Sequence, residues 1–149
     1  MKKWFSLVLL CFVGILSAQK VDKQYFTVVS SYDFAETTTK IKNDLTEKGI
    51  KIFAEIDHTA EAQNVAMELP QTQVLVVGNP KVGTLLMAEN QEIALHLPLK
   101  ILIFEKDKKV FVRYEKINPL ARRYKLKKSL EISQKIDETM ANLLEKAVK

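Results

Sequence analysis

Hydrophobic and polar residues alternate along the chain in runs that predict the elements of one small α+β domain. Residues 25–31 are rich in β-branched and aromatic types, which is typical of a strand. Asp33 then offers an N-cap, Glu36 follows three positions later, and an apolar face at helical spacing continues until Gly49. The pattern therefore predicts a helix between Asp33 and Gly49.

In residues 50–56, every second position is apolar, starting at Ile50, and this two-residue spacing predicts a second strand. We expect one face of this strand to carry Ile50, Ile52, Ala54 and Ile56. The opposite face then carries Phe53 between two charged residues. That second face is therefore mostly polar.

The middle of the chain predicts two helices around a buried strand. A short helix is expected from Thr59 to Leu69, ended by Pro70. The unbroken apolar run 74–77 indicates a strand covered on both faces. Pro80 suits the first position of another helix, which we expect to run to about Glu89.

The last third of the chain predicts a hairpin and a long helix. Strands 99–105 and 110–115 flank a short polar stretch and should pair antiparallel. From about Pro119, apolar residues recur at near-helical spacing and predict one amphipathic helix across the sheet. The order β-α-β-(α)-β-(α)-β-β-α indicates a single α+β domain with a mixed sheet of about five strands packed against helices.

Asp57 and His58 form the first candidate site. They end a predicted strand, where a carboxylate can orient an imidazole for binding or proton transfer. The favoured interpretation is structural, because both residues suit the turn into the following helix and its N-cap. A metal site is the weakest alternative, because the sequence supplies no converging set of three ligands.

The segment 78–84 is the second candidate. Its two glycines before Thr84 resemble a phosphate loop, but the lysine that such a loop places before the threonine is missing, which argues against nucleotide hydrolysis. A helix N-terminus beside Lys81 remains a candidate for holding an anion. The favoured interpretation is a turn between strand and helix.

These two segments converge if the strands 50–56 and 73–78 are parallel. Their fifteen-residue connection is long enough for a crossover, and parallel strands would bring their carboxyl ends to one sheet edge. We therefore expect any ligand site to combine Asp57, His58, Asn79, Lys81 and Thr84, and to suit a small anionic ligand. Antiparallel pairing would exclude this site.

Several short motifs carry a resemblance to a known family. They are Ile56–His58, Glu68–Pro70, Gly78–Pro80 with Gly83 and Thr84, Ala94–Leu95 with Leu97–Pro98, and Asn118, Pro119 and Tyr124. In this order, over about residues 25–146, the chain resembles the Domain of Unknown Function 302 family. His96 departs from the acidic residue expected there. The resemblance implies a compact α/β domain that self-associates as a homodimer, and it implies no activity.

The first eighteen residues predict export. Lys2 and Lys3 precede an apolar run that is too short to cross a bilayer, and Ser17 and Ala18 end it, which is the order of a cleavable signal peptide. We expect a periplasmic or secreted protein without a permanent membrane anchor. Cys11 is the chain's only cysteine and lies inside this segment, so disulfides and thiolate chemistry are excluded from the remainder.

Composition narrows the functional classes without choosing one. The net charge of +5 falls to +3 once Lys2 and Lys3 are removed, so no nucleic-acid partner is expected, and the basic stretch 122–128 is interpreted as a solvated helix face. No cofactor is indicated. The sequence favours a domain that binds a small ligand or a protein partner without catalysis. An enzyme using Asp57 and His58, and a structural dimer of the cell envelope, are the alternatives.

The signal-peptide interpretation predicts that the mature protein begins at Gln19, because Ala18 is the small residue that ends the apolar run. The intact mass of protein isolated from its own host measures this directly. Retention of residues 1–18 in membrane fractions would contradict it.

Overall fold

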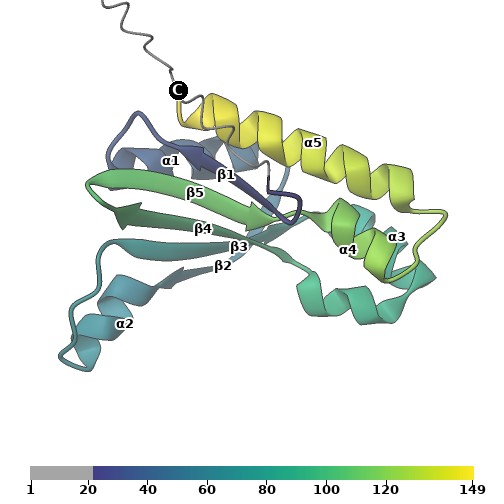
Figure 1. Ribbon diagram of the computed structural model, residues 1–149, viewed down its shortest axis with the longest axis horizontal. Coiled ribbons are helices and arrows are strands. Elements are labelled where there is room, and N and C mark those ends of the chain that lie inside the picture. Colours follow the sequence, from purple (N-terminus) through teal and green to yellow (C-terminus); the bar gives the residue numbers. More distant parts are fainter. Residues whose placement is uncertain (1–21) are drawn as a thin grey trace, which may run out of the picture.

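The computed structural model describes residues 22–149, so the predicted signal peptide, residues 1–18, lies outside the described residues. Within residues 22–149, no helix has both the length and the apolar character needed to cross a membrane. The described chain forms one five-stranded sheet with two long helices on one face (Figure 1). The elements are β1 (Tyr25–Val29), α1 (Phe34–Glu47), β2 (Lys51–Asp57), α2 (His58–Asn64), β3 (Thr72–Gly78), α3 (Pro80–Glu89), η1 (Gln91–His96), β4 (Leu99–Lys106), β5 (Lys109–Glu115), α4 (Ile117–Arg123) and α5 (Leu130–Ala147).

The strands lie in the order β1-β5-β4-β3-β2. Every neighbouring pair is antiparallel. The predicted α+β class and the single domain of five strands are confirmed, whereas the expected mixed sheet is antiparallel throughout. β1 and β2 are the two edges, although they follow one another along the chain, so α1 carries the chain across the whole sheet.

The parallel arrangement expected for β2 and β3 is wrong. A parallel crossover must return along the full strand, which is about 23 Å for seven residues. The helix α2 has seven residues, or about 10 Å, and buries none of them, so it cannot cover a sheet face on the way back. The connection instead forms a long hairpin, with α2 projecting beyond the end of β2 and the start of β3 (Figure 1). The helix expected from Thr59 to Leu69 therefore ends at Asn64, and Val65 and Leu69 are exposed.

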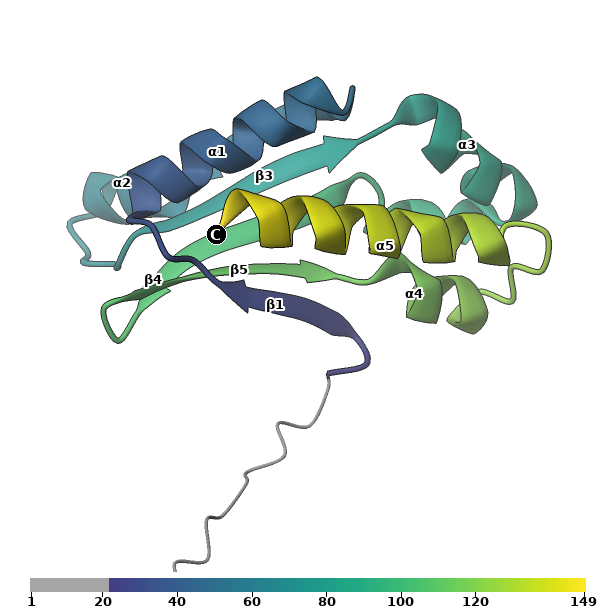
Figure 2. The same ribbon diagram turned by 90° about the horizontal axis from the view of Figure 1, so that it is seen from above.

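The core lies between the sheet and the helices α1 and α5, which pack side by side on the same face (Figure 2). Alternate residues of β3, β4 and β5 point into it and are fully or almost fully buried: Leu75, Val77, Ile101, Ile103, Val112 and Tyr114. Ile41 and Leu45 of α1 are completely buried against them. The N-cap predicted for α1 is present, since the Asp33 carboxylate accepts the Glu36 N–H at 2.8 Å.

A β-bulge in β2 overturns the predicted alternation. The pairing with β3 shifts between Ile52 and Ala54, so one extra residue, Phe53, is inserted into the strand. Ile52 lies opposite the buried Val77, whereas Ala54 and Ile56 lie opposite residues of the other sheet face. Ile52 and Ile56 therefore belong to different faces. Side chains along a strand alternate between the two faces of the sheet, so one inserted residue moves all later side chains to the opposite face.

The predicted hairpin is confirmed. β4 and β5 pair antiparallel up to Lys106 and Lys109, and the two residues between them have φ values of 52° and 59°. Left-handed φ at both central residues is the geometry of the tight turn that matches strand twist.

The single helix expected from Pro119 onwards is two helices. α4 ends at Arg123, and Lys125 adopts a φ of 58°, which breaks the helical path before α5 begins. Glu89, at the end of α3, fixes the start of α5. Its carboxylate accepts the N–H groups of the connecting residues Lys127, Lys128 and Ser129 at 2.6, 2.9 and 2.8 Å. The basic stretch 122–128 therefore spans a helix end and a loop.

These hydrogen bonds, led by that of Lys128, lower the pKa of Glu89 from its ordinary 4.5 to about 2. A lowered carboxyl pKa stabilises the fold fully above the unfolded value and less as the pH falls through the folded value. We expect Glu89→Gln to lower the melting temperature by a few degrees at pH 7, and the difference from wild type to shrink between pH 4.5 and pH 2.

Thermal unfolding followed by circular dichroism measures this difference across pH. Glu92→Gln removes the same charge from an exposed position on η1 and serves as the control. An unchanged pH profile in Glu89→Gln would contradict the capping role.

Candidate functional site

An apolar groove of about 640 Å³ opens beside α3, on the helix side of the sheet. In Figure 2, α1 and α5 separate towards α3, and the groove lies in this region, between the end of α1, α3 and the first half of α5. The floor is formed by the strand ends, including Val77 and Leu99. We call this feature the α3 groove.

The wall from α5 is a stripe of residues three or four positions apart. It consists of Ile132, Lys135, Ile136, Thr139 and Met140. Met140 is buried, whereas Ile132 and Ile136 are only half-buried although they pack against the core. Apolar side chains that remain half-exposed at the core's edge form a surface that gains free energy when an apolar ligand covers it.

The bulge in β2 supplies the edge of the groove. Phe53 lines it and remains 43% exposed, although its ring lies near the backbone of Gly78. A Cβ atom at Gly78 would lie 3.6 Å from Cε2 of Phe53 and 3.5 Å from Cβ of Pro98. The ammonium of Lys51 lies 4.9 Å from the centre of the Phe53 ring, which places a cation at this edge.

Gly83 leaves a gap in the α3 wall of the groove, because it has no side chain. It lies inside α3, where glycine is less favourable than alanine by about 1 kcal/mol. A Cβ atom there would lie 3.9 Å from Cδ1 of Leu97 and 4.0 Å from Cε of Met87, two other residues that line the groove. No steric conflict therefore requires glycine at this position, and its lack of a side chain keeps the groove wide.

Among residues 22–149, the charged side chains that line the groove are Lys48 and Lys135, and no acidic side chain lines it. Lys135 forms an ion pair with Glu131 at 2.8 Å, and the hydrogen bond that its ammonium donates to this carboxylate raises the pKa of Lys135. Lys48 caps the end of α1 and makes no ion pair with any residue from 22 to 149. The groove is therefore apolar with a positive rim.

The convergence predicted for the five candidate residues is wrong. Asp57 pairs with Gln73 at the start of β3, whereas Gly78 pairs with Lys51, so His58 and Asn79 lie at opposite ends of the two strands. Asn79 and Thr84 line the α3 groove, but Lys81 does not. The antiparallel return through α2, rather than a crossover, separates the two halves.

Capping explains the polar residues at both turns. The Asp57 carboxylate accepts the Ala60 N–H at 3.0 Å, and the Asn79 side chain accepts the Lys81 N–H at 3.0 Å. The N–H groups of the next two residues of α3 bond to the Asn79 carbonyl. The expectation of exposed N–H groups for an anion is therefore not met, because the first turn of α3 is already satisfied. Across residues 22–149, no three histidine, cysteine or acidic side chains gather as a metal site would require.

Sequence reasoning missed two features of the site. The α5 stripe was interpreted only as a face that covers the sheet, because spacing cannot show where the cover is incomplete. His96 was noted only as a departure, yet its ring nitrogens lie 3.3 Å from Oε2 of Glu115 and 3.2 Å from the Tyr124 hydroxyl. This half-buried cluster joins η1, β5 and the end of α4, outside the α3 groove.

Curated relatives match most of this chain. Fluoride-specific ion channel FluC 1 of Brucella suis biovar 1 (strain 1330) is 32% identical over 119 residues, which are 79% of this chain and 47% of that protein. FluC 2 of Brucella melitensis biotype 1 is also 32% identical over 119 residues, 44% of its length. The chain thus spans less than half the length of these relatives.

A solved structure and a family model agree on the fold. The crystal structure of an uncharacterized conserved DUF302 protein from Bacillus stearothermophilus matches with a TM-score of 0.70 at 17% identity, covering 85% of this chain and 97% of that chain. The model of the domain of unknown function DUF302 matches residues 26–147. This match spans almost all of the described fold, as the motifs around Gly78–Pro80 and Leu97–Pro98 indicated, and the chain belongs to the DUF302 family.

Proposed function

We propose that this protein is an exported, non-catalytic binding domain that holds a small apolar ligand in the α3 groove. The observation that supports this most is the groove itself, whose apolar lining is left open at the edge of an otherwise closed core. Its volume of about 640 Å³ lies within the range usual for small-molecule sites, about 300–1,000 Å³. Export is supported by the order of charged, apolar and small residues in 1–18.

The polar groups in the groove favour binding over catalysis. Acid–base chemistry needs a titratable group within hydrogen-bond reach of the reacting atom. Among the residues that line the groove, the titratable side chains are Lys48 and Lys135, and the second is held by Glu131. The side-chain oxygen of Asn79 already accepts the Lys81 N–H as the cap of α3. The lining can therefore hold and orient a ligand more readily than it can transform one.

The enzyme alternative gains no support from Asp57 and His58. The carboxylate of Asp57 caps α2, and both residues are exposed at the end of the sheet remote from the groove. A substrate there would meet α2, which buries none of its residues and offers no enclosing wall.

Ligand binding in the groove predicts that a bulky residue at position 83 blocks it. We expect the neutral fluorescent dye Nile red to bind the wild-type protein, and Gly83→Leu to weaken that binding at least fivefold, because the new side chain occupies the groove. Fluorescence titration measures the affinity.

Lys81→Leu places the same side chain on α3 at an exposed position that does not line the groove. It should bind the dye as the wild type does. Equal dye binding by Gly83→Leu and the wild type, with both proteins folded by circular dichroism, would contradict the proposal.

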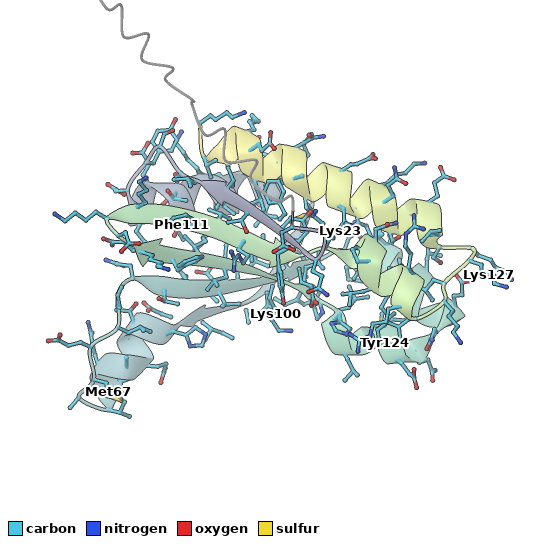
Figure 3. The ribbon with its side chains drawn as sticks, in the orientation of Figure 1. Lys23, Met67, Lys100, Phe111, Tyr124 and Lys127 are labelled. Carbon is cyan, nitrogen blue, oxygen red and sulfur yellow. The ribbon has the colours of Figure 1, made fainter. Side chains whose placement is uncertain are left out.

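A homodimer is the second proposal, and the open face of the sheet is the surface that favours it. This face, turned away from α1 and α5, carries the stacked rings of Phe104 and Phe111, whose centres are 5.3 Å apart. Val29 and Ile56 on the same face are 46% and 40% exposed. Figure 3 shows Phe111 on β5 and Lys100 on β4, so charged residues interrupt the apolar surface. A second copy covering this face would bury apolar side chains that are exposed in one chain.

Phe111 lies on this face and Phe53 lines the groove, so the two phenylalanines give a matched test. We expect a dimer by light scattering at tens of micromolar, a monomer for Phe111→Lys, and an unchanged dimer for Phe53→Lys. A wild-type monomer at these concentrations would exclude the interface.

A further inference from the structure

We infer that the ligand of the α3 groove is a single-chain amphiphile with an anionic head group, bound with its head at Lys48 and its alkyl chain along the α5 stripe. This inference rests on the proposed function and specifies the ligand's chemistry. Three observations carry it: the direction of the apolar wall, the sign of the charges at the rim, and the different pairing of the two lysines.

The apolar wall is long and narrow. From Ile132 to Met140 the α5 stripe rises about 12 Å. Across from it, α3 contributes Met87 and the side-chain gap at Gly83. A flexible alkyl chain can follow such a stripe over its length. A sugar or a nucleotide would instead need many hydrogen-bonding partners, and the groove supplies few beyond Asn79, which is already engaged, and two threonines.

The charges at the rim select the head group. Lys48 and Lys135 line the groove, Lys51 lies over the Phe53 ring at its edge, and no acidic residue in the described part of the chain lines it. A cationic head would meet the like charges of the lysines, and a neutral head would leave Lys48 without a partner. A carboxylate or a phosphate complements them, and both share the required chemistry.

Lys48 is the better of the two lysines for the head group. Lys135 already has an anionic partner in Glu131 at 2.8 Å, whereas Lys48 has none among residues 22–149. Lys48 also stands where α1 ends and the groove meets solvent, with Ile50 beside it on the lining. An anionic head there stays hydrated on one side while the chain leaves water.

The test compares amphiphiles that share a twelve-carbon chain, using isothermal titration calorimetry on the mature chain. We expect dodecanoate and dodecyl phosphate to bind more tightly than dodecanol, and dodecyltrimethylammonium to bind most weakly. Comparison of the first two separates a carboxylate from a phosphate head. Shortening dodecanoate to decanoate should weaken binding about fourfold per methylene.

Lys48→Gln should weaken dodecanoate binding about three- to tenfold and leave dodecanol binding unchanged. Lys40→Gln is the matched control, because it removes one positive charge from the same helix at a position that does not line the groove. Raising the salt concentration should weaken dodecanoate binding to the wild type and not dodecanol binding.

The outcomes distinguish the two proposals. If dodecanol binds as tightly as dodecanoate, and Gly83→Leu weakens both, the groove binds apolar ligands but the anionic head is overturned. Equal losses in Lys48→Gln and Lys40→Gln overturn the role of Lys48. If no amphiphile binds but Nile red does, this inference fails alone, and if neither binds, the proposed function fails with it.

Discussion

The structure depends on one topological constraint: the chain must travel from one edge of the sheet to the other between its first two strands. β1 and β2 are opposite edges, so α1 crosses the full width of the sheet on the same face as α5. Two helices that cross a sheet in different directions cannot remain in contact along their whole length. They separate towards α3, and the α3 groove lies where their cover ends. The site is thus a consequence of how the core is closed.

Local features keep this opening from being filled. The bulge at Phe53 shapes the edge of the groove, and the absence of a side chain at Gly83 leaves room in it. Each departs from the most stable local choice, a regular strand or a helix-favouring residue. Glu89 fixes the start of α5 and thereby positions the stripe that forms the opposite wall. Proteins usually retain such departures from local stability at functional sites.

Elements defined by local chemistry could be predicted from the sequence, and elements defined by distant contacts could not. The Asp33 cap and Gly49 mark the ends of α1, and the polar residues around Asp107 mark the hairpin, because these signals act within a few residues. The direction of β3 depended on whether α2 covers the sheet, and the fifteen-residue length of the connection did not reveal this. The bulge at Phe53 was missed too, because the apolar residues at positions 50, 52, 54 and 56 keep the two-residue spacing of a regular strand. Within the site, the sequence identified turn and cap residues such as Asn79. It could not identify the groove, because the groove depends on the relative positions of the three helices α1, α3 and α5.

The most direct measurement of the central claim is a methyl NMR titration of the labelled protein with dodecanoate. If the α3 groove is the binding site, the methyl signals of Ile132, Ile136 and Met87 shift in a saturable way, because these side chains line it. The signals of Val74 and Leu102, which lie on the open face of the sheet, stay in place. Saturable shifts at Val74 and Leu102 without shifts in the groove would contradict the account.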